Sequence, residues 1–73
     1  MKGNDVMITE RQIIAEGKHH WIMRHDKGWL EVLRIGVTHS TRCATIDFRR
    51  EPERQLALAM AEMARRDALV DAA

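Results

Sequence analysis

The chain has 73 residues, of which 45% are hydrophobic and 32% charged, and its formal net charge is +1. This length predicts one domain that buries about 60% of the surface its unfolded chain exposes, and the apolar fraction argues against disorder. No run approaches the ~20 apolar residues of a membrane-spanning helix, and the single cysteine excludes an internal disulfide, so we expect a cytoplasmic protein without membrane contact.

The first residues, MKGNDVMI, show no periodicity, and we expect residues 1–8 to form a flexible arm whose Met7 and Ile8 could dock on a partner. Residues 9–73 should form a single compact α+β domain. Thr9 is placed as a helix N-cap, Gln12 as its capping-box partner and Gly17 as a left-handed stop. These signals predict a short helix over residues 9–16, with a strand as the alternative because so short a helix is marginal alone.

A β-hairpin is predicted next. Residues 19–25 and 29–37 flank the turn Asp26-Lys27-Gly28, which has glycine where a left-handed residue is wanted. Residues 43–48, CATIDF, alternate apolar and polar side chains, as a strand buried on one face does. The three strands should form an antiparallel meander.

A long C-terminal helix should begin near Pro52, because proline suits the first turn and Glu51 and Glu53 suit the positive end of the helix dipole. The remainder is rich in Ala, Leu, Met, Glu and Arg and contains no Gly or further Pro. We expect this helix to pack across the sheet through one stripe, formed by Leu56, Met60, Met63 and Val70 with Ala59 and Ala64 beside it.

Metal binding and catalysis have only weak support. Zinc could use imidazole and thiol ligands, which this chain offers in His19, His20, His25, His39 and Cys43. However, neighbouring strand residues point to opposite faces, and no paired ligand motif is present. Cys43 with His39 lacks an evident third group or pocket for nucleophilic catalysis. We therefore expect no catalytic residue, metal or cofactor.

Interface residues are easier to nominate, because Trp and Arg are enriched at the energetic centres of protein interfaces. Residues 17–50 hold seven Lys or Arg against three Asp or Glu, a net +4. This basic segment could contact an acidic protein face or nucleic acid. The candidate anchors are Trp21, Ile22 and Trp29, and the candidate basic contacts are Arg24, Lys27, Arg34 and Arg42.

The predicted order of helix, three strands and helix is also that of the double-stranded RNA-binding domain. That family grips phosphates with a lysine-rich start to its last helix, whereas this chain has Glu51 and Glu53 there. Recognition of an RNA duplex by this route is therefore disfavoured. The basic strands could still contact a single strand or a phosphate track, so nucleic-acid binding remains an alternative function.

Three stretches read together, MKGNDVMITERQIIAEGKHHWIM, the DKGW turn and EPERQLALAMAEMARRDA, resemble the small early transcription regulators of lytic Xanthomonas phages. The resemblance covers the whole chain and rests on overall appearance and length. It implies a non-enzymatic protein that binds the β and β′ subunits of bacterial RNA polymerase near the RNA exit channel, displaces the σ factor and promotes antitermination. We expect a monomer close to nascent RNA or DNA, with self-pairing of the Ala- and Met-rich helix as another alternative.

Overall fold

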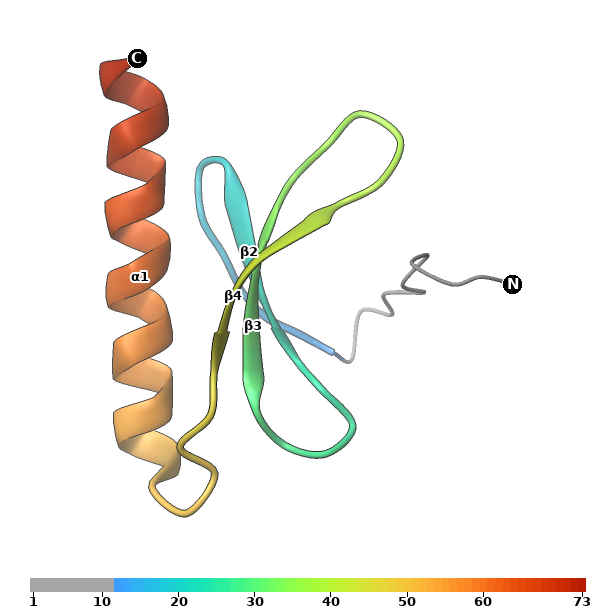
Figure 1. Ribbon diagram of the computed structural model, residues 1–73, viewed down its shortest axis with the longest axis vertical. Helices are drawn as coiled ribbons and strands as arrows, with labels where there is room; N and C mark the ends of the chain where they lie inside the picture. Colours follow the sequence, from blue (N-terminus) through green and yellow to red (C-terminus); the bar gives the residue numbers. More distant parts are fainter. Residues whose placement is uncertain (1–11) are drawn as a thin grey trace.

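The computed structural model describes residues 12–73 and has the α+β architecture expected from the sequence: one antiparallel sheet with a helix on one face (Figure 1). The sheet order is β1-β2-β3-β4, so each strand pairs with the next in the chain. The elements are β1 Ile13–Glu16, β2 His20–Arg24, β3 Leu30–Arg34, β4 Thr41–Ile46 and α1 Pro52–Ala72. The predicted arm of residues 1–8 lies outside the described residues.

The sheet has four strands where the sequence predicted three, because β1 replaces the second half of the expected N-terminal helix. β1 pairs antiparallel with β2, placing Ile13 opposite Met23 and Glu16 opposite Trp21. The helix prediction is therefore wrong over Ile13–Glu16, and the strand alternative holds there. Two consecutive β-branched isoleucines favour a strand, and the neighbouring strand supplies the hydrogen bonds that a two-turn helix could not hold alone. The proposed N-cap, Thr9, lies outside the described part of the chain.

The predicted hairpin turn between β2 and β3 is confirmed. Gly28 has φ +103°, a left-handed conformation that costs glycine little. The backbone N–H of Gly28 donates to the carbonyl of His25 at 2.8 Å, and the N–H of His25 donates to the carbonyl of Trp29 at 2.8 Å. The strands themselves are shorter or shifted relative to the predicted ranges 19–25, 29–37 and 43–48.

The core lies between the sheet and α1. Strand residues Ile22, Leu30 and Val32 pack against Ala59 and Met63 of the helix. Because strand side chains alternate between faces, Trp21, on the same strand as Ile22, faces away from α1. The sheet therefore has one face that packs on the helix and a second face directed away from it.

The residues of α1 that pack on the sheet are not the stripe that their hydrophobicity predicts. Its buried residues are Gln55, Ala59 and Met63, whereas Leu56 and Met60 retain 42% and 43% exposure. The prediction was correct for Met63 and wrong for Leu56 and Met60. Small Ala59, fully buried, brings the helix backbone close to the sheet, and Gln55 is drawn inward by hydrogen bonds described below.

The β1–β2 turn is attached to the C-terminal half of α1 through Asp67. Its carboxylate accepts backbone N–H bonds from Lys18 and His19, both at 2.9 Å, and lies 2.6 Å from Nδ1 of His20. Burial opposes the ionised carboxylate, but the hydrogen bonds from His20, His19 and Lys18 outweigh it and lower the pKa of Asp67 below its ordinary value. This attachment joins residues almost 50 positions apart in the sequence.

Gly17 occupies this turn for a reason other than the predicted left-handed helix stop. Its φ is not in the left-handed region. Instead, a Cβ atom here would lie 2.5 Å from Oδ2 of Asp67 and 2.9 Å from Sδ of Met63. The close approach of α1 to the turn therefore requires glycine.

Candidate partner-binding surface

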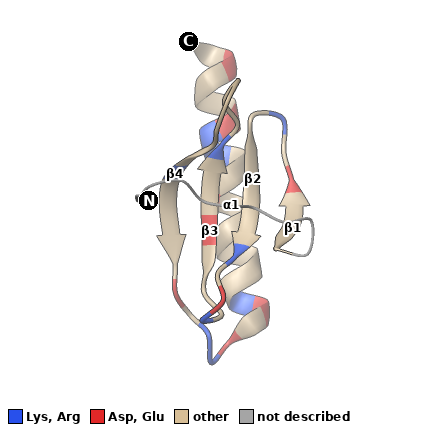
Figure 2. Cartoon of the chain, turned by 90° about the vertical axis from the view of Figure 1, so that its right-hand side faces the viewer, with Lys and Arg blue, Asp and Glu red and all other residues tan. Residues whose placement is uncertain are grey.

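Basic and aromatic side chains gather at one end of the molecule, where the β2–β3 turn meets the β4–α1 loop and the first turn of α1. We call this region the hairpin end. Figure 2 shows Lys, Arg, Asp and Glu side by side at this lower end. Three of the predicted site residues, Arg24, Lys27 and Trp29, lie here. The fold adds four that the sequence argument missed, namely Phe48, Arg49, Arg50 and Arg54.

Gln55 holds the two loops of the hairpin end together. Its side chain is only 4% exposed. Its Nε2 donates to the carbonyl of Gly28 at 3.0 Å, and its Oε1 accepts the backbone N–H of Phe48 at 2.8 Å. One buried amide thus links the β2–β3 turn and the β4–α1 loop to the helix. No sequence signal indicated this role, because Gln55 lies outside the stripe of α1 that hydrophobicity predicted for the core.

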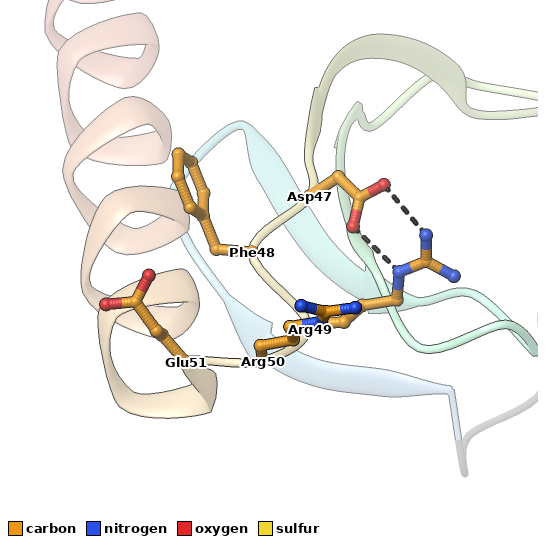
Figure 3. A pocket seen from close by; sticks show the side chains of 5 residues that line it. All are labelled: Asp47, Phe48, Arg49, Arg50 and Glu51. Carbon is orange, nitrogen blue, oxygen red and sulfur yellow. Dashed lines mark hydrogen bonds and ion pairs between the residues drawn. The ribbon is translucent and has the colours of Figure 1, made fainter.

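Arg49 adds a second connection between the same loops. Its Nη1 donates to the carbonyl of Lys27 at 3.2 Å, while Nε and Nη2 bind the two carboxylate oxygens of Asp47 at 2.8 and 3.2 Å. This fork geometry fixes the guanidinium in place. Figure 3 shows Asp47 and Arg49 on one side of the loop and Phe48 turned toward α1.

Trp29 is held on several sides. The ring of His25 stacks on it at 4.0 Å with an interplanar angle of 17°, and the guanidinium carbon of Arg49 lies 5.3 Å from the centroid of the indole ring. Its Nε1 donates to Oε2 of Glu31 at 3.0 Å. The tryptophan is half-buried, so it both supports the turn and shows part of its ring at the surface.

Three other cations of the hairpin end have no carboxylate partner among the described residues. Arg24, Lys27 and Arg50 are exposed, and their side chains form no ion pair with any residue in the range 12–73. Beside them the β4–α1 loop borders an open hollow of about 560 Å³, lined by Asp47, Phe48, Arg49, Arg50 and Glu51. An acidic group could therefore approach these cations without displacing a carboxylate of residues 12–73.

The other predicted contacts are not part of the hairpin end. Ile22 is fully buried beneath α1, so its prediction as a surface anchor is wrong: its place on the inner face of β2 commits it to the core. Arg34 ends β3 at the opposite end of the sheet. Trp21 is half-buried on the sheet face away from α1. Met7 and Ile8 lie outside the described residues.

Arg42 forms an ion pair within the sheet with Glu31, a residue that was not among the predicted contacts. Glu31 is 2% exposed. Its Oε2 forms an ion pair with Nε of Arg42 at 3.2 Å and accepts a hydrogen bond from the indole N–H of Trp29. No described residue donates to its Oε1. A buried carboxylate of this kind depends strongly on the donors it has, so Arg42 is placed to stabilise β3 and β4.

The histidines nominated as metal ligands have other partners. Nε2 of His19 lies 2.8 Å from Asp71, and His20 binds Asp67 as described above. Between residues 12 and 73 no group of three or more His, Cys, Asp or Glu side chains is placed to hold a metal ion. In the same range, no helix is both long and apolar enough to cross a bilayer.

Comparison of the chain with protein families, with curated proteins and with solved structures finds no match.

Proposed function

We propose that this chain is a non-enzymatic regulator that binds bacterial RNA polymerase and that the hairpin end is its contact surface. The observation that carries the proposal is a set of exposed cations that form no ion pair with any described residue. Arg24 ends β2, and Lys27 and Arg50 lie on the two loops that Gln55 and Arg49 hold together. The resemblance of the sequence to phage transcription regulators supplies the partner.

Rigidity favours a binding role for this surface. Ordering a loop on association lowers affinity, so a loop already fixed by internal hydrogen bonds loses less on binding. The Gln55 amide and the Arg49 guanidinium provide that order before any partner arrives. Half-buried Trp29 and exposed Phe48 add aromatic area beside the cations, and interface centres are enriched in aromatic residues and arginine.

The expected action follows from the resemblance. The protein would engage the β and β′ subunits near the RNA exit channel in the host cytoplasm, displace the σ factor during initiation and favour antitermination. Competition of this kind needs a compact scaffold with a complementary surface and no chemical step. Acidic side chains on the polymerase would be the natural counterparts of Arg24, Lys27 and Arg50.

The test is native electrophoresis of the full chain with polymerase core and with σ-containing holoenzyme. The wild type should shift the core and release σ. Arg50→Glu and Lys27→Glu should each weaken binding about tenfold or more, as reversal of an interface charge does. Arg34→Glu is the matched control, because Arg34 is also exposed but lies at the far end of β3. An unshifted polymerase, or an equal effect of the control, would refute the proposal.

Nucleic-acid binding is the second candidate, because the exposed cations of the hairpin end share that end with Trp29 and Phe48, and bases stack on aromatic rings. Parallel lanes with free RNA and DNA distinguish it. A shift of nucleic acid without polymerase, with affinity falling steeply as salt rises, would favour this alternative. Tryptophan quenching by an oligonucleotide would support it independently.

A further inference from the structure

The outer side of α1 carries a continuous ridge of alanine. Ala57, Ala61, Ala64 and Ala68 recur at spacings of four, three and four, and all are exposed. At about 100° per residue, they lie on the side of the helix opposite Ala59 and Met63, which pack on the sheet. In Figure 1 the sheet lies on one side of α1, and no other described element lies on the far side. We call these four residues the alanine ridge.

Large apolar side chains border the ridge. Leu58 is 38% exposed and Met60 is 43% exposed, one on each side of the alanines. Of the exposed large hydrophobic residues in the described chain, four belong to α1. A helix that faced only water would be expected to carry polar side chains on its outer face.

We propose that α1 pairs with α1 of a second copy of this chain, antiparallel, along the alanine ridge. The spacing is that of the two core positions of a heptad seam. In the antiparallel register centred between Glu62 and Met63, Ala57 faces the partner's Ala68 and Ala61 faces the partner's Ala64. Every central layer then contains only alanine, which allows the two helix axes to approach to about 8 Å.

Charge identifies a second copy as the occupant. The same heptad pattern, continued beyond the alanines, reaches Arg54 at one end and Asp71 at the other. In the antiparallel register Arg54 faces the partner's Asp71, and symmetry repeats this pair at the other end. A parallel pair would instead place Arg54 beside the partner's Arg54 and Asp71 beside the partner's Asp71, which is unfavourable. The ridge is thus complementary to itself in one orientation.

Both terminal charges can be reached by a partner. The side chain of Arg54 is 58% exposed and that of Asp71 is 45% exposed. Each already has partners in its own chain: Arg54 pairs with Glu51 and stacks over the ring of Phe48, and Asp71 binds Lys18 and His19. A carboxylate has acceptor sites for a further donor. Pairing along a single helix buries less than the ~1,600 Å² of a standard interface, so the dimer should dissociate on dilution and the expected monomer should prevail at low concentration.

Sedimentation of the full chain tests this inference, with reductant present so that Cys43 cannot link copies through a disulfide. The mean mass should rise toward that of a dimer between about 10 μM and 1 mM, as mass action requires for a weak interface. Ala64→Glu, in the central layer, should raise the dissociation constant tenfold or more. Leu69→Glu is the matched control, because Leu69 is 58% exposed but lies off the ridge.

The charge pair provides a sharper test. Arg54→Asp and Asp71→Arg should each weaken self-association, and the two together should restore it to within about threefold, because the opposed charges are exchanged. Thermal melting of each variant checks that it remains folded. A chain that stays monomeric at the highest concentration, or a combined variant that is folded but not restored, would overturn the inference. So would an Ala64→Glu variant that still self-associates but no longer binds polymerase, since the ridge would then be a polymerase contact.

Discussion

Replacing Gly17 by alanine should destabilise the protein, although the backbone conformation there would tolerate alanine. Where no clash exists, Gly→Ala gains about 0.4–1 kcal/mol by restricting the unfolded chain. Here the new Cβ would lie 2.5 Å from Oδ2 of Asp67 and 2.9 Å from Sδ of Met63. The Asp67 carboxylate cannot withdraw freely, because it accepts the N–H groups of Lys18 and His19 and contacts His20.

The magnitude follows from what must be displaced. Losing one hydrogen bond to a charged group costs about 1.5–3 kcal/mol, and crowding a packed site costs about 1–3 kcal/mol. After subtracting the gain from the unfolded state, we expect Gly17→Ala to lower the free energy of unfolding by about 1.5–5.5 kcal/mol. For a domain of this size that corresponds to a fall in Tm of ~4–8 °C per kcal/mol.

Urea and thermal denaturation would measure the effect, and a double-mutant cycle would identify its cause. In an Asp67→Ala background the same glycine substitution should cost less than half as much, because the carboxylate that it displaces is gone. An increase in stability for Gly17→Ala, or an unchanged cost in the Asp67→Ala background, would refute the explanation by close approach.

Three further predictions concern side chains that stabilise the fold. The pKa of Asp67 is lowered in the folded state. The ionised carboxylate therefore stabilises the fold above the ordinary Asp pKa of 3.8, and this stabilisation is lost as pH falls through the folded pKa. In urea denaturation, Asp67→Asn should be less stable than wild type at neutral pH, and the difference should shrink in acid. Gln55→Leu should cost about 2–4 kcal/mol in chemical denaturation, since both loops lose their buried partner; a cost too small to measure would contradict its bracing role. Met63→Ala should cost about 2–5 kcal/mol, whereas Met60→Ala should cost under about 1 kcal/mol, and equal costs would show that the burial assignment of α1 is wrong.

Local sequence signals were sufficient where one short segment contains the whole cause. The hairpin turn is one example, because its left-handed conformation depends only on Gly28 and the residues beside it. Pro52 likewise lies in the first turn of α1, where its missing N–H has no cost. The α+β class followed from these segments because their periods, near two and near 3.6, differ clearly.

Signals failed where the structure of a segment depends on the element that it contacts. The capping signals of Thr9 and Gln12 favoured a helix, but Ile13–Glu16 instead pairs with β2, the next strand in the chain. For α1, hydrophobicity favoured Leu56 and Met60 as core residues. Packing instead selected Ala59, because its small size permits close approach, and Gln55, because two loops offer it hydrogen bonds.

The residues of the hairpin end also fall into two groups, those that the sequence identified and those that only the fold brings there. From the sequence alone, Arg24, Lys27 and Trp29 could be nominated because they surround one turn. Phe48, Arg49 and Arg50 join them only because β4 returns beside β3 and brings its following loop to the same end of the sheet. The sequence by itself determined the hairpin turn at Gly28, the long helix and the residue types available for binding. Tertiary structure decided which of these side chains meet and which are buried, because burial depends on the neighbours that distant segments provide.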